Sequence, residues 1–165
     1  MKLIKYIIVG TLIVIGGMCL SHCQDNVSIS IYQDAKLAFV GDDKGNDAFT
    51  PNILTRVNFN CKQDKNGYGF VFPEFEYAAL QGGEYFRYSL NGGYTFNQII
   101  PKIEASLTGG IGMIHRNNVS GLSLGCSGVL SYKLGRFSPS IMLQLTDRYD
   151  LNKWRTSGFI GIKYN

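Results

Sequence analysis

Four charged residues that could carry chemistry alternate with apolar residues in three successive segments of the chain. Glu74 and Glu76 are two positions apart, so on a β-strand their carboxylates share one face. Arg56 and Arg87 have equivalent places in the segments before and after. The carboxylates could form a catalytic acid–base pair or line an ion path, or they could form salt bridges with the arginines. Since a lone buried charge costs several kcal/mol, we favour an inward-facing, paired network that also includes Glu104.

His115 is the only histidine after residue 23 and the one candidate base of an enzyme. Ser120 or Ser123 could serve as its nucleophile, with Asp43 as a supporting acid. No recognised catalytic pattern links these residues, and a single histidine at a strand end is more often an ordinary surface residue. We therefore expect no catalytic site, and no residue spacing indicates a metal or another cofactor.

The segments that hold these side chains alternate apolar and polar residues, which is typical of strands with one apolar face. Each is about ten residues or longer, the length that a tilted strand needs to cross a bilayer. The pattern predicts an all-β fold, an eight-stranded antiparallel up-and-down barrel in a membrane, in which no strand edge is left open. The expected strands lie within 27–42, 52–63, 68–80, 85–96, 102–113, 122–134, 137–146 and 154–164.

An even number of strands places both chain ends at the same end of the barrel, together with every second turn. The turns expected there are Gln63–Gly67, Asn97–Pro101 and Gly135–Arg136. The connections expected at the opposite, outer end are Gly41–Thr50, Leu80–Glu84, His115–Ser120 and Asp147–Lys153. Asp64-Lys65-Asn66-Gly67 carries the strongest turn signal, because Asn-Gly accepts positive φ angles.

The first 23 residues are typical of an export signal. Lys2 and Lys5 precede an uncharged apolar run from Tyr6 to Leu20, and Gln24 would begin a single mature domain, residues 24–165. A retained anchor helix and lipidation at Cys23 are the alternatives. Without the two lysines the chain carries 16 − 2 = 14 basic and 12 acidic residues, and it has no basic block, so we expect no nucleic-acid partner.

Aromatic residues gather toward the ends of the expected strands, where rings with a polar group would lie at the level of lipid headgroups. The five assigned to this interface are Phe86, Phe96, Tyr132, Trp154 and Tyr164. Cys61 and Cys126 are expected on the same outer face, with no disulfide between them. The alternative is a secreted soluble β-sandwich or lipocalin-like barrel, in which the apolar faces would point inward.

Several local features resemble the small outer-membrane β-barrel superfamily, the OmpA/OmpX-like barrels of Gram-negative bacteria. They are the alternating strands after an export signal, Gly-aromatic pairs such as Gly93-Tyr94, and the last strand, Gly158–Asn165. Cys23-Gln24-Asp25 and the final Gly-Ile-Lys-Tyr-Asn are similar to Bacteroidetes-type barrels, although these barrels usually end in an aromatic residue and here Asn165 follows Tyr164.

The resemblance implies a place in the outer membrane, with the lipid bilayer, its lipopolysaccharide and the outer-membrane insertion machinery as partners. Members of this group serve as anchors, adhesins, defence proteins or, less often, lipid-modifying enzymes, and no functional residue carries over to this chain. We expect a non-enzymatic envelope protein with a side-chain-plugged lumen, whose outer loops bind a surface ligand. The alternative is a lipid A-modifying barrel enzyme that uses His115 as its base.

Overall fold

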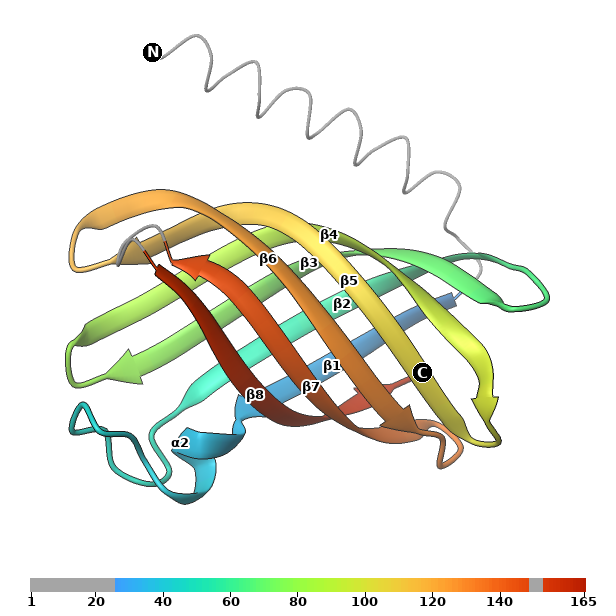
Figure 1. Cartoon of the computed structure of the whole chain (residues 1–165), viewed down its shortest axis with the longest axis horizontal. Coiled ribbons are helices and arrows are strands. Elements are labelled where there is room, and N and C mark those ends of the chain that lie inside the picture. Colours follow the sequence, from blue (N-terminus) through green and yellow to red (C-terminus); the bar gives the residue numbers. More distant parts are fainter. Residues whose placement is uncertain (1–25, 149–152) are drawn as a thin grey trace, which may run out of the picture.

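The computed structural model describes residues 26–148 and 153–165, which form one closed barrel of eight antiparallel strands (Figure 1). This confirms the predicted all-β barrel fold. The expected export signal, residues 1–23, lies outside the described residues. No helix in the described ranges is long and apolar enough to cross a membrane. The elements are β1 (Asn26–Asp34), α2 (Ala35–Phe39), β2 (Asn52–Gln63), β3 (Gly67–Leu80), β4 (Gly83–Ile100), β5 (Ile103–Arg116), β6 (Val119–Tyr132), β7 (Phe137–Arg148) and β8 (Lys153–Tyr164).

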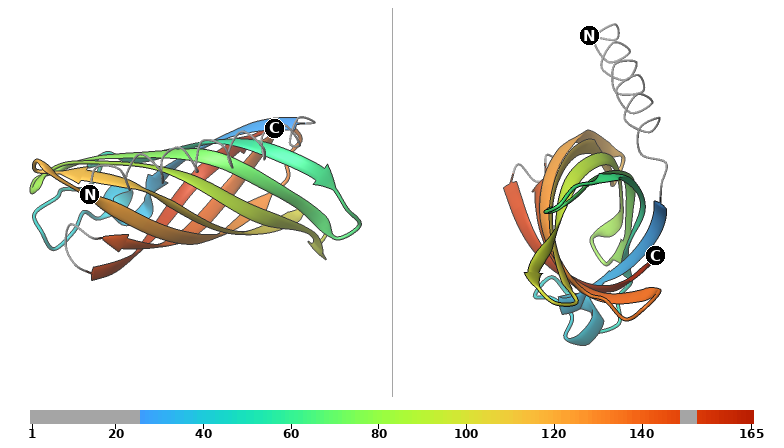
Figure 2. Two further views of the ribbon diagram at one scale, coloured as in Figure 1. Left: turned by 90° about the horizontal axis from the view of Figure 1, so that it is seen from above. Right: turned by 90° about the vertical axis from the view of Figure 1, so that its right-hand side faces the viewer.

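Each strand pairs with its neighbours in sequence, and β1 pairs with β8 to close the sheet. The two longest unbroken ladders join β3 to β4, from Gly67 opposite Phe96 to Leu80 opposite Gly83, and β5 to β6, from Ile103 opposite Tyr132 to Arg116 opposite Val119. Seen along the barrel the strands form a ring, and α2 with the loop after it projects beyond that ring (Figure 2). Because the strands alternate direction, the start of β1 and the end of β8 lie at one end of the barrel, here called the terminal end; the opposite end is the loop end.

Polar side chains fill the inside of this barrel, and apolar side chains cover its outside. Among the described residues, polar or charged residues outnumber apolar ones in the buried set by 21 to 11. Ile29, Leu107 and Leu143 are about half to two-thirds exposed on the outer wall, although they lie in the middle of regular strands. A sheet with these faces is the reverse of a soluble barrel or sandwich, where the apolar face is buried.

The two cysteines in the described range have different states. Cys126 is an exposed free thiol on β6. Cys61, near the end of β2, is disulfide-bonded, and because Cys126 is free no disulfide joins Cys61 to Cys126, as expected.

The first strand ends at Asp34, although the alternation of apolar and polar residues continues beyond it. The strand is expected within residues 27–42, with its outward apolar positions continuing to Phe39, but the chain leaves the sheet at Asp34 and forms the helical turn α2. Asp34 caps this turn, because its Oδ1 accepts a hydrogen bond from the Leu37 backbone N–H at 3.1 Å. Leu37 is only 2% exposed, so burial and the cap together override the local strand pattern.

Several expected connections are shorter in the structure, because the strands continue further than predicted. Asn97–Pro101 falls largely within β4, which runs to Ile100, and His115–Ser120 shrinks to the turn at Asn117 and Asn118. Both asparagines have positive φ, 47° and 64°, as a two-residue hairpin turn requires. The Leu80–Glu84 connection shrinks in the same way, to residues 81–82. The tip of the Asp147–Lys153 loop lies outside the described residues.

The turn between β2 and β3 is where the sequence predicted it, but Asp64 organises it. Neither Asn66 nor Gly67 has a positive φ. Asp64 Oδ1 instead accepts the backbone N–H groups of Asn66 at 2.7 Å and Gly67 at 2.8 Å, which forms an Asx turn. The hydrogen bond from Asn66, together with those from Tyr94 and Gly67, lowers the pKa of Asp64.

Inward-facing glycines make room for large side chains across the lumen wall. A Cβ on Gly161 would lie 2.4 Å from the Tyr32 ring and 2.3 Å from the Ile31 backbone oxygen. A Cβ on Gly93 would lie 2.8 Å from the Phe70 ring in the same way. These rings therefore lie flat over glycine on the neighbouring strand, an arrangement that fills a narrow barrel without widening it.

We predict that Gly161→Ala destabilises the barrel by about 1–3 kcal/mol, because the added methyl group overpacks the contact with Tyr32. Gly158→Ala on the same strand is the matched control, since a Cβ at Gly158 meets nothing within 4 Å. Denaturant unfolding in detergent, followed by tryptophan fluorescence, measures both. Equal unfolding midpoints for the two variants would contradict this account of Gly161.

Candidate functional site: the charged lumen and the loop-end rim

Glu74 on β3 lies at the centre of the lumen and is 1% exposed. Its Oε2 accepts a hydrogen bond from Arg56 Nε at 2.6 Å, and its Oε1 accepts one from Arg87 Nη1 at 2.5 Å. Gln144 on β7 donates to the same Oε1 at 3.1 Å. One carboxylate therefore joins four strands through charge-assisted bonds inside the barrel, and the lumen is bridged at this level.

The two arginines are held on all sides. Arg56 lies over the rings of Phe72 and Tyr32, with its guanidinium carbon 4.8 Å and 5.5 Å from the ring centres. Its Nη2 also donates to Ser127 Oγ at 3.1 Å. The rings of Tyr32 and Phe72 and the hydroxyl of Ser127 thus hold the Arg56 guanidinium in position to pair with Glu74.

Arg87 is fixed by a serine, and its place depends on a glycine. Arg87 Nε donates to Ser123 Oγ at 3.0 Å. A Cβ on Gly125 would lie 2.8 Å from Arg87 Nη2, so only glycine leaves this much room for the guanidinium. Nη2 has no hydrogen-bond partner within the described part of the chain.

Glu76 extends the network toward the loop end. It is 6% exposed, its Oε2 lies 4.0 Å from Arg87 Nη1, and the same oxygen accepts a hydrogen bond from Tyr85 OH at 3.2 Å. Two arginines and two glutamates are thus enclosed together, with no net charge. Above them, Ala78, Tyr85 and Ile114 form an apolar cluster that separates the network from the loop end.

Glu104 also faces inward, but it belongs to a second cluster nearer the terminal end. Its partners are Lys133 Nζ at 2.8 Å, Lys163 Nζ at 3.6 Å and Tyr68 OH at 3.4 Å. Lys163 also donates to Tyr68 OH at 3.1 Å. The five residues expected to form one network therefore belong to two clusters. Arg56, Glu76 and Arg87 surround Glu74, whereas Glu104 lies beside two lysines.

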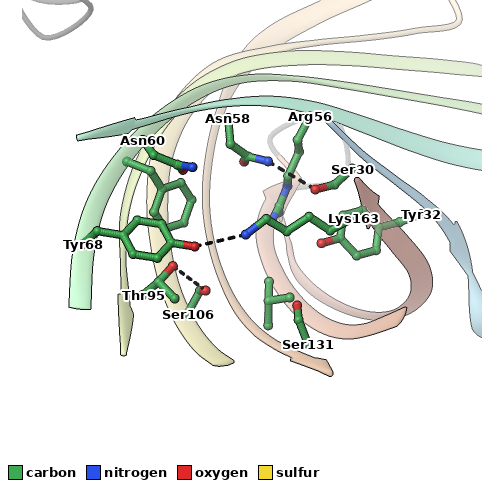
Figure 3. A pocket seen from close by; sticks show the side chains of 12 residues that line it. Ser30, Tyr32, Arg56, Asn58, Asn60, Tyr68, Thr95, Ser106, Ser131 and Lys163 are labelled. Carbon is green, nitrogen blue, oxygen red and sulfur yellow. Dashed lines mark hydrogen bonds between the residues drawn. The ribbon is translucent and has the colours of Figure 1, made fainter. Parts of the chain in front are cut away.

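A small polar cavity lies between the two clusters (Figure 3). Its volume is about 20 Å³, enough for roughly one water molecule. Arg56 and Lys163 both line it, with Lys163 Nζ directed toward Tyr68, and Asn58 and Thr95 are among the other polar groups on its wall. A cavity of this size leaves room for no more than about one water molecule between the two clusters.

Aromatic side chains lie on the outer wall in two groups. Phe86 and Trp154 are exposed near the loop end, whereas Phe96, Tyr132 and Tyr164 are exposed near the terminal end. Phe86 and Phe96 are ten residues apart on β4, a distance of about 33 Å along the strand or about 25 Å along the axis of a barrel with strands tilted about 40°. Between the groups, outward positions on the described strands carry no Asp, Glu, Lys or Arg.

The rim at the loop end holds His115 and Ser120, which the sequence had suggested as a possible base and nucleophile. They face each other across β5 and β6, with Ser120 Oγ 2.6 Å from His115 Nδ1, and the imidazole stacks on Tyr88. His115 lines an open depression with Glu84, Arg116, Asn117 and Asn118.

The other suggested members of a catalytic group lie elsewhere. Ser123 is buried inside the barrel and accepts a hydrogen bond from Arg87. Asp43 pairs with Lys36 Nζ at 2.6 Å in the loop after α2, and this bond lowers the pKa of Asp43. The described residues contain no cluster of three or more His, Cys, Asp or Glu side chains suited to a metal.

The loop after α2 is tied to the neighbouring hairpin. Asp42 accepts hydrogen bonds from Lys44 N and Asn46 N, and burial, which raises its pKa, is outweighed by these bonds and by the Asn46 amide. The pKa of Asp42 is therefore lowered. Asn46 Oδ1 accepts the backbone N–H of Gln81 at 2.7 Å, so a hydrogen bond joins two of the loop-end connections.

Sequence reasoning missed the uncharged members of the lumen site. Gln144, Ser123 and Ser127 carry no charge and follow no motif, yet each contacts a central charged group. Their alternating position on the polar face of their strands was the available signal. Tyr68 was missed because it lies at the beginning of β3, where the side it faces is ambiguous from sequence.

We predict that Glu74→Gln lowers the free energy of unfolding by about 3–5 kcal/mol, since it leaves buried Arg56 without a countercharge and Arg87 with only Glu76, 4.0 Å away. The matched control is Glu84→Gln on the exposed side of β4, which should change stability little. Denaturant unfolding of both variants in the same detergent gives the comparison. If the two substitutions have the same small effect, the bridge at Glu74 does not stabilise the barrel.

No protein-family model, curated protein or solved structure matches this chain. The functional argument therefore rests on the geometry of the barrel: a charge-paired interior, an uncharged apolar wall between two aromatic groups, and a polar rim at the loop end.

Proposed function

We propose that this protein is a non-enzymatic β-barrel of the outer membrane of a Gram-negative bacterium, of the small OmpA/OmpX-like type. In this proposal residues 1–23 are a cleaved export signal, both termini lie in the periplasm, and the barrel, residues 24–165, is inserted by the outer-membrane machinery. Its loop-end rim faces outward and binds a surface partner, while the lumen serves as a rigid support.

The observation that carries this proposal is the outer wall. A wall with half-exposed Ile, Leu and Phe side chains and no charge between the aromatic groups would aggregate in water, but it matches a bilayer core. The axial separation of about 25 Å between Phe86 and Phe96 fits the height of the apolar band of such barrels. Aromatic rings such as Trp154 and Tyr164 favour the headgroup level.

The alternative of a soluble binding barrel is less compatible with the interior. A soluble barrel that binds an apolar ligand needs an apolar cavity, whereas this lumen contains the charged cluster around Glu74 and a cavity of about 20 Å³. The paired charges support a plug, because each one has its countercharge within the barrel.

The placement of the loops supports a recognition role. The end of α2 and the loop after it contain exposed Phe39, Val40 and Phe49 beside acidic residues, and Asn46 joins this loop to the β3–β4 connection by a hydrogen bond. Loops held on a rigid scaffold are where binding residues concentrate.

We predict that the protein fractionates with the outer membrane and shows a heat-modifiable gel shift, because a closed barrel stays folded in detergent until it is boiled. Membrane fractionation followed by electrophoresis of unboiled and boiled samples tests this. Recovery as a soluble periplasmic protein would refute the membrane placement and favour the secreted binding barrel.

We also predict that the pure protein gives no steady, large conductance in planar bilayers, because side chains fill the lumen of an eight-stranded barrel. Single-channel recording measures this directly. A stable open channel from homogeneous protein would contradict a plugged lumen, and an ion path past Arg56 and Glu74 would then be the better interpretation.

A second candidate function is lipid A modification, and the 2.6 Å contact between Ser120 Oγ and His115 Nδ1 is the observation that favours it. The pair lies on the outer wall beside the apolar band, where a lipid ester could approach. In serine hydrolases, however, the serine contacts Nε2 while Nδ1 binds the acid, so this contact would require the ring to turn over.

The two candidates predict different results for His115→Ala and for replacement of residues 43–47 by a Gly/Ser loop. If the barrel is non-enzymatic, His115→Ala leaves the lipid A profile unchanged in mass spectrometry, and the loop variant loses surface binding. A lipid A modification that requires the protein and disappears in His115→Ala would establish the enzyme instead.

A further inference from the structure

The ladder that closes the barrel covers only half of β8. β7 pairs with β8 along its whole length, from Phe137 opposite Tyr164 to Arg148 opposite Lys153. β1 pairs with β8 only from Ile29 opposite Tyr164 to Asp34 opposite Phe159. Within the described ranges, residues 153–158 thus have no strand partner on the β1 side. A strand edge of this kind presents unpaired N–H and C=O groups that can accept another strand.

The helical turn α2 lies where β1 would continue. It packs against both β1 and β8, beside the unpaired half of β8 (Figure 1). A helix of five residues is not stable alone, because nucleation costs more than so few hydrogen bonds return. It is held by the Asp34 cap and by burial of Leu37, while the Lys36–Asp43 ion pair and the bond from Gln81 N to Asn46 Oδ1 hold the loop that follows.

The sequence of this region also fits a continued hairpin between β1 and β2. Extending the observed register from Gln33 opposite Ile53 would place Leu37 opposite Phe49 and Val40 opposite Asn46. The chain between them would be a turn that contains Gly41 and Gly45, which already have positive φ angles of 82° and 90°. The loop after α2 therefore has the composition of a hairpin that the structure leaves unformed.

The same extension fits the free edge of β8. Continuing from Asp34 opposite Phe159, Leu37 would lie opposite Thr156 and Phe39 opposite Trp154. Both leucine and phenylalanine would then share the outward face of Ile29 and Ile31, because they are an even number of residues away. The extended strand would complete the apolar outer wall beside residues 153–158 of β8, which β1 does not reach.

The helical arrangement has costs that the extended one would remove. Phe39 is 68% exposed and Phe49 is 83% exposed, and Phe49 also has a positive φ of 67°, which is unfavourable for a side chain of this kind. The extended arrangement has its own costs. It loses the Asp34 cap, the Lys36–Asp43 ion pair and the hydrogen bond from Gln81 N to Asn46 Oδ1, and Pro51 cannot donate to the ladder. Because each arrangement has unfavourable interactions that the other lacks, a change of surroundings can shift the equilibrium between them.

We propose that residues 35–51 are a conformational switch that closes the barrel wall. In one state residues 35–39 form the helical turn seen here, and in the other residues 35–40 and 46–51 extend β1 and β2 and pair with residues 153–158 of β8. The extended state is favoured by a lipid bilayer, because it places Leu37, Phe39 and Phe49 against acyl chains. This inference rests on the proposed membrane location.

The test is a disulfide between Phe39→Cys and Trp154→Cys in a Cys61→Ser, Cys126→Ser background, which has no other cysteine after residue 23. Residues 35 and 39 are about 6 Å apart along a helix but about 13 Å apart along a strand, so residue 39 comes opposite residue 154 only in the extended state. Ile31→Cys with Ile162→Cys is the matched control, since this pair occupies an equivalent position in the observed ladder. Mild oxidation of intact outer membranes, followed by peptide mass spectrometry, measures both disulfides.

In membranes we expect the disulfides of the test pair and of the control pair to form in comparable yield. In detergent micelles we expect only the control disulfide, between positions 31 and 162, to form. Formation of the control disulfide alone in the outer-membrane fraction would overturn the switch and leave the proposed function intact. Absence of the protein from that fraction would overturn both. Hydrogen exchange on the unsubstituted protein in membranes is an independent measurement. Rapid exchange of the amides of residues 153–158, with slow exchange of those of residues 159–164, would also refute the extension.

Discussion

The carboxylate of Glu74 is the point on which the interior of this barrel depends. It accepts hydrogen bonds from β2, β4 and β7 while it belongs to β3, so it ties opposite walls of the lumen together. A buried carboxylate without partners would be strongly unfavourable, and so would either buried arginine. Each of these groups is tolerable only because the barrel closes with the register that brings them together. The charge network therefore specifies the register of the strands as much as it stabilises them.

The apolar groups around this network strengthen it. Tyr32, Leu54, Val129, Met142 and Phe159 form a buried cluster next to the charged residues. They exclude water and lower the local dielectric constant, which strengthens each ion pair but also raises the cost of an unpaired charge. Such an interior tolerates rearrangement poorly, and this argues for a rigid scaffold rather than a passage through which solutes move. Any change in shape is then confined to the segments outside the ladder, of which α2 and its loop are the largest.

Alternation in the sequence was sufficient to predict the strands, their faces and the inward direction of Arg56, Glu74, Arg87 and Glu104, because a period of two follows directly from strand geometry. It could not predict which charges meet, since that depends on the register of strands far apart in sequence. Glu104 was grouped with the arginines but lies beside Lys133 and Lys163. The turn α2 was missed because residues 35–39 keep the alternating pattern, although Asp34 three residues before Leu37 is a helix-capping signal.

The difference between the predicted strand and the observed α2 has another cause than the differences in turn length. The strands around Asn117 and Asn118 continue because two left-handed asparagines complete a tight turn, and the local sequence and the structure agree once that turn is recognised. At residues 35–40 the strand pattern and the structure disagree while a vacant strand edge lies alongside. Natural sequences rarely maintain an outward-facing apolar alternation where no ladder uses it, because exposed Phe and Val favour aggregation. The persistence of that pattern beside the open half of β8 is therefore best explained if the ladder forms under conditions in which lipid covers this wall.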